Sequence, residues 1–265
     1  DAGREAAAST TQPTLRAYLE TRAAAFLTND YYESDLAWMA IDATIELYGV
    51  LGSTIAGVKQ ENEIAAEVFA FALRHQLQVS YEPVIASGRN AVTLHYVDNN
   101  APLEKNGLLL LDVGLRADNY AADITRTIIL KPTQRQRDVY QAVMAVHEAA
   151  CSYLRTGVLL KDYEKQVERA MGEELQKLGL IKTIDRDAVR KYYPHATSHF
   201  LGIDVHDVGD VNTPLVPGVV LTVEPGIYIP EEGIGIRLED DVLITEDGCQ
   251  NLSAALPKRI DSLTI

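Results

Sequence analysis

Cysteine is scarce in this chain, with two residues, Cys151 and Cys249, among 265. No Cys-x-x-Cys spacing occurs, so the sequence indicates neither a zinc knuckle nor a disulfide framework, and we expect a reducing, cytoplasmic setting. Basic residues are also few: 24 Lys and Arg against 38 Asp and Glu give a formal net charge of −14. This charge argues against nucleic acid or an anionic membrane surface as a partner.

Long apolar runs are missing as well. None approaches the roughly 18–20 residues that a membrane span requires, and the start of the chain shows no signal-peptide core. We therefore expect no membrane partner. The hydrophobic content of 47% is ordinary and allows a sizeable core, in one large domain or in a domain with an appendage.

The order of expected elements gives the fold class. Residues 1–33 are predicted to form an N-terminal linker or helical extension, and residues 34–265 one domain. Helical spacing predicts helices at 15–27, from 34, at 59–75, from 133 and from 162, with a capping box formed by Thr133 and Gln136 and a cap at Asp162. Strand-rich stretches are expected at 79–130, with a short strand at 93–97, and at 192–245. Helices, strands, helices and strands in this order predict an α+β fold built from two similar halves.

The most informative stretch runs from Gly107 to Leu130, where two apolar runs flank a polar segment at 116–120. Such runs predict a β-hairpin. Antiparallel pairing would set Asp112 and Asp123 opposite each other. Two carboxylates so close in an apolar sheet need protons, cations or a metal ion. Taken alone, the pair is explained equally well without a function, with one aspartate as a turn residue and the other as a strand-end residue.

A second apolar stretch repeats this arrangement. Glu224 ends an apolar run and is followed by Pro-Gly, while Glu239 lies within the strand-like segment 236–244. The period of two along a strand places Arg237 and Glu239 on one face. Because two hairpins carry two carboxylates each, it is a poorer explanation that these carboxylates are merely solvated strand ends.

Three of the six histidines fall within twelve residues, at His195, His199 and His206. The odd step from His199 to His206 would put them on opposite faces of a straight strand, but Gly202 offers a bend that returns both to one pocket. A lone histidine is usually a surface or core residue, whereas three together favour a site. Four carboxylates and one imidazole suit two divalent ions such as Mn, Co, Fe or Zn, which lie about 3.5–4 Å apart in hydrolytic centres.

These residues stand in motifs that resemble those of the pita-bread metallopeptidases, in the aminopeptidase P and prolidase branch. The motifs are Ile85-Ala-Ser-Gly-Arg-Asn-Ala-Val-Thr-Leu-His95-Tyr, Asp112-Val-Gly with Ala122-Asp123-Ile-Thr-Arg-Thr, His195-Ala-Thr-Ser-His199-Phe-Leu-Gly-Ile-Asp-Val-His206-Asp, Leu221-Thr-Val-Glu224-Pro-Gly-Ile-Tyr228, and Gly235-Ile-Arg237-Leu-Glu239-Asp-Asp. Five motifs in this order are specific, where a single one would not be. The resemblance implies the creatinase/aminopeptidase-like fold, a curved antiparallel sheet with helices on its outer face and pseudo-twofold halves.

The resemblance also implies a metal centre. Asp112 would hold one ion, Asp123 and Glu239 would bridge two, and His199 and Glu224 would complete the second. Glu224 would in addition act as general base toward the attacking water. The implied cofactors are two divalent ions per chain, with manganese favoured and cobalt, zinc or iron as alternatives.

The remaining matched residues would face the substrate. His95 and His206 would line the substrate side as catalytic residues that stabilise the tetrahedral intermediate. His195, Tyr228 and Arg237 would bind substrate or support the ligands, and a purely structural role suits these three equally well.

The resulting hypothesis is a dinuclear metallo-exopeptidase for peptides with proline at the second position, because an Xaa-Pro bond lacks an N–H and ordinary peptidases handle it badly. An Xaa-Pro dipeptidase, a methionine aminopeptidase-like enzyme and a metal-free binding module on the same scaffold stay open as alternatives, as does a homodimer. Members of this branch usually carry a separate N-terminal domain, whereas only about 33 unmatched residues precede the similar region here. We therefore expect a catalytic domain without that domain, or a piece of a longer protein.

Overall fold

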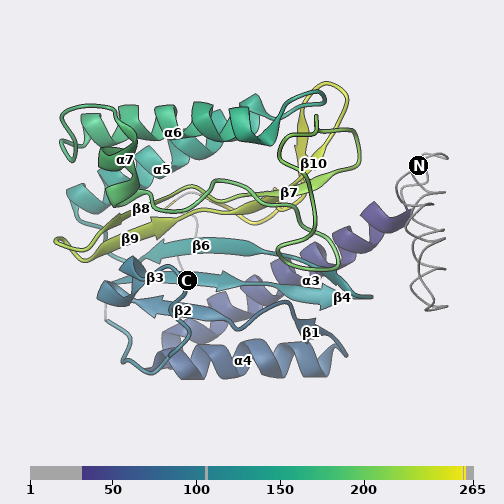
Figure 1. Ribbon diagram of the computed structural model, residues 1–265. Helices are drawn as coiled ribbons and strands as arrows, with labels where there is room; N and C mark the ends of the chain where they lie inside the picture. Colours follow the sequence, from purple (N-terminus) through teal and green to yellow (C-terminus); the bar gives the residue numbers. More distant parts are fainter. Residues whose placement is uncertain (1–31, 105–106, 259, 261–265) are drawn as a thin grey trace. The chain divides into compact units, whose positions relative to one another are not determined.

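The computed structural model describes residues 32–104, 107–258 and 260 (Figure 1). The chain divides into two compact units, Asp1–Leu36 and Ala37–Ile265, and apart from the first residues of one helix every described element belongs to the second unit. The helix expected at 15–27 lies outside the described residues. The domain boundary expected after residue 33 stays a prediction.

The described elements follow the expected order of helices, strands, helices and strands, which confirms the α+β class. The helices are α3 (Tyr32–Thr54), α4 (Glu61–Arg74), α5 (Gln134–Tyr153), α6 (Leu160–Lys177) and α7 (Arg186–Tyr192), with 3-10 turns η1 (Ile55–Gly57) and η2 (Gly88–Val92). The strands are β1 (Gln78–Val79), β2 (Val84–Ser87), β3 (Leu108–Val113), β4 (Leu115–Ala117), β5 (Tyr120–Ala121), β6 (Ile124–Ile129), β7 (Val220–Val223), β8 (Gly226–Ile229), β9 (Ile234–Arg237), β10 (Asp240–Ile244) and β11 (Cys249–Asn251).

Two long hairpins organise the strands, and every ladder in the described structure is antiparallel. In the first hairpin, β3 pairs with β6 and β4 with β5 in one continuous register. Asp118 and Asn119 close it with φ of 46° and 74°, the left-handed pair of a two-residue turn that matches the strand twist. In the second hairpin, β7 pairs with β10 and β8 with β9, again in one register. The two halves therefore repeat one design.

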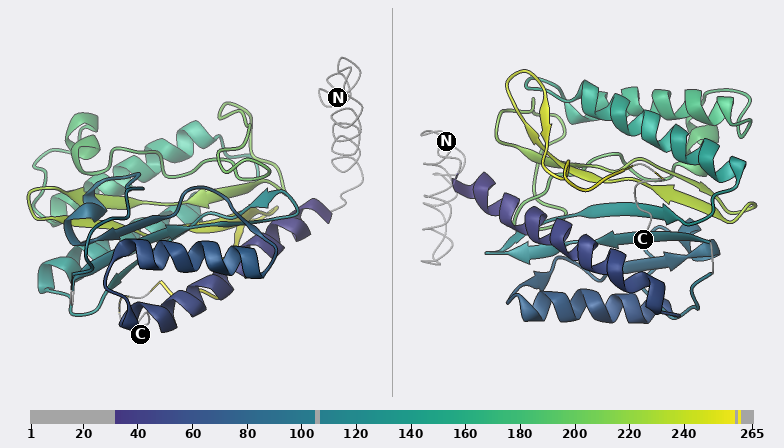
Figure 2. Two further views of the ribbon diagram at one scale, coloured as in Figure 1. Left: turned by 90° about the horizontal axis from the view of Figure 1, so that it is seen from below. Right: turned by 180° about the vertical axis from the view of Figure 1, so that it is seen from behind.

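The leucine run of β3 is buried on both faces because helices cover both sides of its sheet. Leu108 and Leu110 point into a core shared with α5 and α6, while Leu109 and Leu111 point into a second core shared with α3 and α4. The alternation follows the period of two along a strand. Figures 1 and 2 show the strands between these two helix pairs.

Of three local features expected from the sequence, one forms and two do not. The capping box at Thr133 forms, since Thr133 Oγ1 accepts from Gln136 N at 3.2 Å and Gln136 Oε1 accepts from Thr133 N at 2.9 Å. The expected strand at 93–97 is wrong, because this segment forms no ladder and continues from η2 as irregular chain. The cap expected at Asp162 is also wrong, because α6 begins at Leu160 and Asp162 lies in its first turn.

Candidate metal centre

The first hairpin brings Asp112 and Asp123 together, although not as the directly opposed pair expected from the sequence. Asp112 pairs with Thr125, and Asp123 lies just before β6. The expectation was wrong by two residues, because the turn at 118–119 fixes the register. The Tyr81 hydroxyl joins the two carboxylates, at 2.6 Å from Asp112 Oδ1 and 2.6 Å from Asp123 Oδ1.

One phenol proton cannot serve both carboxylates at once. The second short contact of Tyr81 is therefore favourable only when one aspartate carries a proton of its own. Burial raises the pKa of Asp112, while the neighbouring Arg237 charge lowers it and the charge of Asp123 raises it further. The two carboxylates thus lie where a cation would stabilise them.

The second hairpin supplies the other two carboxylates. Glu224 follows β7 and Glu239 precedes β10, so the continuous register sets them across the hairpin from each other. Glu239 is tied to the first hairpin, because the Thr125 hydroxyl donates to Glu239 Oε2 at 2.6 Å and Glu239 N donates to Thr125 O at 3.1 Å. These two hydrogen bonds align the carboxylates of the two hairpins.

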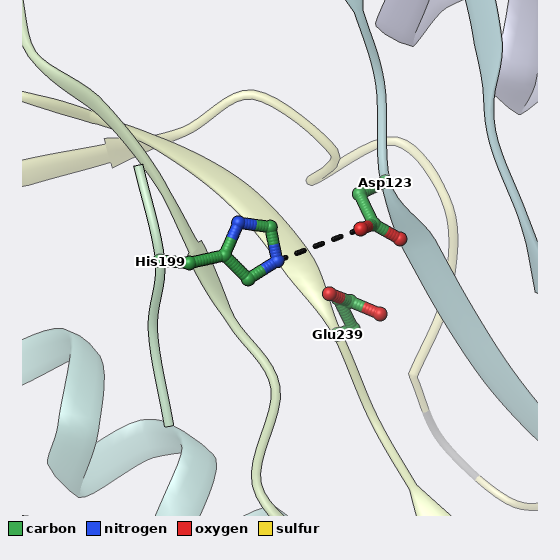
Figure 3. Close-up of side chains that lie close together, drawn as sticks. All are labelled: Asp123, His199 and Glu239. Carbon is green, nitrogen blue, oxygen red and sulfur yellow. Dashed lines mark ion pairs between the residues drawn. The ribbon is translucent and has the colours of Figure 1, made fainter. Parts of the chain in front are cut away.

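Asp123, His199 and Glu239 form a cluster in which one ligand atom from each lies within 4.8 Å of the others (Figure 3). His199 Nε2 lies 3.6 Å from Asp123 Oδ2 and 3.6 Å from Glu224 Oε1. Its Nδ1 lies 3.0 Å from the Phe200 carbonyl, which can only accept a hydrogen bond. Nδ1 must therefore hold its proton, which leaves Nε2 to face the carboxylates.

Burial sets the electrostatics of this cluster. It raises the pKa of Glu224 to about 8 and that of Glu239 well above its usual range, where the charges of Asp123 and Glu224 add to the effect. Burial opposes the charged form of His199, but the hydrogen bond and charge of Asp123 outweigh it and raise the pKa of His199 to about 9. Without a metal ion, protons on Glu224 and His199 therefore offset part of the negative charge of the cluster.

Arg237 spans the floor of the site from a buried position on β9. It donates from Nη2 to Asp112 Oδ2 at 2.6 Å, from Nε to Thr125 Oγ1 at 3.0 Å, and from Nη1 to the Tyr228 hydroxyl at 2.9 Å. The Tyr228 oxygen lies 3.0 Å from His195 Nε2. Because Tyr228 accepts from Arg237, its own proton is free to be donated to His195.

His195 is accordingly a neutral imidazole. Its Nδ1 lies 2.8 Å from the Ala196 carbonyl, so Nδ1 donates and Nε2 accepts. Burial lowers the pKa of His195 to about 3, and the Arg237 charge acts in the same direction. His195 Nδ1 also lies 3.5 Å from Glu224 Oε2, which places the neutral ring beside the expected general base.

The chain does bend at Gly202 and bring His206 back to His199, as expected, since their ring centroids are 4.3 Å apart in an edge-on arrangement. Burial lowers the pKa of His206, and the His199 charge adds to the effect. His95 is exposed, and its charge contributes to the lowered pKa of both His195 and His206. The charge of His95 therefore reaches both His195 and His206.

Sequence reasoning missed the partners that orient these ligands. Tyr81 lies in the short connection between β1 and β2, where no pattern distinguishes it from a turn residue. Thr125 stands inside a motif quoted above, so its place beside Asp123 was a usable signal. Of the five expected ligands, Asp123, His199 and Glu239 form the cluster, Glu224 lies 3.6 Å from His199 Nε2, and Asp112 is linked to Asp123 through the Tyr81 hydroxyl.

The donor set suits a divalent cation. Carboxylate oxygens with one imidazole nitrogen are ligands for Mn, Fe, Co or Zn. Burial, together with the neighbouring carboxylates, raises the pKa values of Asp112, Glu224 and Glu239, and the Arg237 charge offsets this only in part. A cation in this position would replace the protons and could activate water for hydrolysis.

Comparisons with known proteins agree with this chemistry. Residues 31–246 match the model of metallopeptidase family M24. The chain is 41% identical over 208 residues to the Xaa-Pro aminopeptidase of Escherichia coli, an alignment that covers 70% of this chain and 47% of that protein. It is 35% identical over 274 residues to Xaa-Pro aminopeptidase 1 of Streptomyces coelicolor, covering 94% of this chain and 55% of that protein.

Among solved structures, the zinc-substituted Escherichia coli aminopeptidase P in complex with product matches with a TM-score of 0.80 and 34% sequence identity. The match covers 88% of this chain and 57% of that one. The chain thus spans about half the length of the relatives it matches. In the part of the chain that the structure describes, no helix combines the length and apolar character needed to cross a bilayer.

Proposed function

Because the chain belongs to metallopeptidase family M24 and adopts the pita-bread fold, we propose that it is a metal-dependent exopeptidase that hydrolyses the bond before a proline at the second position of peptides. The observation that carries the proposal is the convergence of Asp123, His199 and Glu239 on one place from three separate segments. The Xaa-Pro aminopeptidase names of the relatives support the substrate class. Since the chain spans about half of those proteins, the activity is proposed for the site that it contains.

We infer that the site holds two divalent ions, with manganese favoured and cobalt, zinc or iron as alternatives. The ligands would be Asp112, Asp123, His199, Glu224 and Glu239. Bound ions would supply Lewis acidity toward the scissile carbonyl and would ease the deprotonation of water. The zinc-substituted state of a relative supports a centre that tolerates more than one metal.

The chain's own residues would divide the remaining work. Glu224 would accept the proton of the attacking water at its carboxylate, the role of a general base. His95 and His206 would donate hydrogen bonds to the oxygen on which negative charge develops. Neutral His195, with Tyr228 and Arg237 behind it, would hold Glu224 and the substrate in place.

Proline at the second position explains why such a site is needed. The residue has a fixed φ and its peptide nitrogen carries no proton, so a site that depends on an N–H contact would reject it. The proposed partners are therefore free peptides with an N-terminal Xaa-Pro sequence. A solved relative is described in complex with the inhibitor Pro-Leu, which supports a site that accepts a proline-containing dipeptide.

Three alternatives from the sequence remain testable. Equal rates on an Xaa-Pro dipeptide and an Xaa-Pro-Pro tripeptide would favour an open site, whereas activity on the dipeptide alone would identify a dipeptidase. Release of N-terminal methionine before residues other than proline would indicate a methionine aminopeptidase-like enzyme. Absence of bound metal would indicate a binding module. The homodimer and the cytoplasmic location stay predictions.

The decisive experiment is a metal-reconstituted assay. The purified chain is stripped with a chelator, reloaded with Mn²⁺, Co²⁺ or Zn²⁺, and tested on Xaa-Pro-Pro against the same peptide with alanine at the second position. We expect hydrolysis of the proline peptide that depends on metal and is abolished in Glu224→Ala. Activity that survives in Glu224→Ala, or that ignores the second residue, would refute the proposal.

A further inference from the structure

Glu61, which no motif marks, is completely buried at the start of α4. Its Oε1 accepts hydrogen bonds from Ser87 N at 2.8 Å and Asn90 Nδ2 at 2.9 Å. Its Oε2 accepts from the Tyr96 hydroxyl at 2.8 Å and from Ala101 N at 2.9 Å. A buried carboxylate is costly unless it accepts hydrogen bonds, and hydrogen bonds to a charged group are strong. Glu61 therefore holds the four groups that donate to it in place.

These four donors bracket His95 in the sequence, with two before it and two after it. The segment 93–97 forms no strand, so no ladder of backbone hydrogen bonds holds His95 in place. The hydroxyl of Tyr96, the next residue, is bonded directly to Glu61. The exposed imidazole of His95 therefore projects from a loop that Glu61 holds on both sides of the histidine, with further hydrogen bonds between the Asn99 side chain and the backbone at Ile85 N and Pro83 O.

The second histidine segment is fastened in a similar way. Glu164 on α6 accepts at Oε1 from Thr197 N and Ser198 N, at 3.0 Å each. Its Oε2 accepts from Thr197 N at 3.0 Å and from Thr197 Oγ1 at 3.1 Å. These donors lie between His195 and His199. In each half of the fold, a glutamate on a helix that precedes the hairpin thus holds the segment that carries the histidines.

We propose that Glu61 and Glu164 are a matched pair of positioning residues, in which Glu61 fixes His95 on the substrate side and Glu164 fixes His199 at the metal centre. The inference rests on the proposed function, because it assigns each glutamate a role through a histidine of that site. The proposal assigns the two glutamates different measurable effects. Glu61 controls the rate of the reaction, and Glu164 controls the affinity for metal.

Glu61→Gln tests the first half. The substitution preserves shape but turns one oxygen into an NH₂ group, which then faces the N–H of Ser87 or Ala101 in either orientation. We expect kcat on Xaa-Pro-Pro to fall about 10–100-fold, with metal affinity unchanged within about twofold. Glu63→Gln is the matched control, because this exposed carboxylate lies on the same helix and accepts hydrogen bonds from the N–H groups of Lys59 and Gln60, just before α4.

A double-mutant cycle shows whether Glu61 acts through His95. If it does, Glu61→Gln lowers kcat less than about twofold once His95→Ala is present. If the two effects multiply, the assignment of Glu61 is wrong. Should Glu61→Gln fail to fold, Tyr96→Phe removes one of the four hydrogen bonds and takes its place in the cycle, with the same two outcomes.

Glu164→Gln tests the second half through binding of Mn²⁺ or Zn²⁺ alone, measured by calorimetry. We expect the affinity to fall about tenfold, because the segment before His199 is released from α6 while Thr222 still holds the His199 backbone through two hydrogen bonds. Unchanged affinity would overturn this assignment. If the metal-loaded wild-type chain hydrolyses no Xaa-Pro peptide, the proposed function fails by itself. Hydrogen exchange then decides for Glu61: faster exchange of the Ser87 and Ala101 amides in Glu61→Gln supports the positioning role, and unchanged exchange overturns it.

Discussion

His199 Nε2 and Asp123 Oδ2 lie 3.6 Å apart as an ion pair, although one comes from an irregular segment before β7 and the other from the first hairpin. The carboxylate stabilises the charged imidazole, and the pKa of His199 rises to about 9 despite its burial. A charged imidazole has no free lone pair for a metal ion. The pair therefore makes metal binding and proton release a single event.

Metal binding should release protons at neutral pH. In the metal-free protein, His199 with a pKa of about 9 and Glu224 with a pKa of about 8 both carry a proton at pH 7. We expect the affinity for Mn²⁺ or Zn²⁺ to rise from about pH 6 to about pH 9. Calorimetry in two buffers with different ionisation enthalpies counts the protons released. A count of zero at pH 7 would contradict the protonated cluster.

The metal-free protein should lose stability as the pH rises. Both Glu224 and His199 have a higher pKa when folded than their ordinary values of 4.5 and 6.5, so the folded state binds their protons more tightly. That stabilisation is complete below the ordinary values and is lost as the pH passes through about 8 and about 9. We expect Tm in the presence of a chelator to fall between about pH 6.5 and about pH 9.

Glu224→Gln is the control for this pH dependence, because glutamine has no proton to lose. The fall in Tm should be smaller in this variant than in the wild-type chain. A wild-type Tm that rises over the same pH range would mean that the carboxylates of the cluster ionise freely when no metal is bound.

Local rules in the sequence predicted part of the candidate site. The period of two along a strand placed Arg237 and Glu239 on one face, and both do reach the site. The register of the first hairpin was harder. Opposing Asp112 and Asp123 would need a two-residue turn at 117–118, whereas the turn forms one residue later at 118–119, and the polar segment 116–120 allowed either.

Partners distant in the sequence could not be predicted in the same way. Tyr81 contacts two aspartates through its hydroxyl, yet only the folded chain brings them together. The expected strand at 93–97 failed for the same reason, since its composition suits a strand but the buried carboxylate of Glu61 holds it as a loop. Local propensity is overridden where a tertiary contact supplies stronger hydrogen bonds.

Tyr81→Phe should weaken the metal centre without unfolding the protein. The variant keeps the ring but removes the hydroxyl that joins Asp112 and Asp123 at 2.6 Å each. The two carboxylates then lose the group that sets their separation, so we expect metal affinity to fall about 10–100-fold. Calorimetric titration with Mn²⁺ measures the change, and the unfolding midpoint of the metal-loaded protein serves as the check on the fold. Wild-type affinity in Tyr81→Phe would show that the backbone alone places the pair.

Arg237→Lys should destabilise the metal-free protein although it preserves the charge. Lysine cannot reach Asp112, Thr125 and Tyr228 together, because its single ammonium lacks the planar fork that makes these three bonds. At least one buried oxygen then loses its donor, so we expect the free energy of unfolding to fall by about 2–3 kcal/mol in urea titrations. Arg135→Lys is the control, since this guanidinium makes a forked pair with Glu232 and a bond to the Leu178 carbonyl but is 32% exposed, so the loss should stay below about 1 kcal/mol. Equal losses in the two variants would mean that the floor of the site depends on charge alone and not on the geometry of the guanidinium.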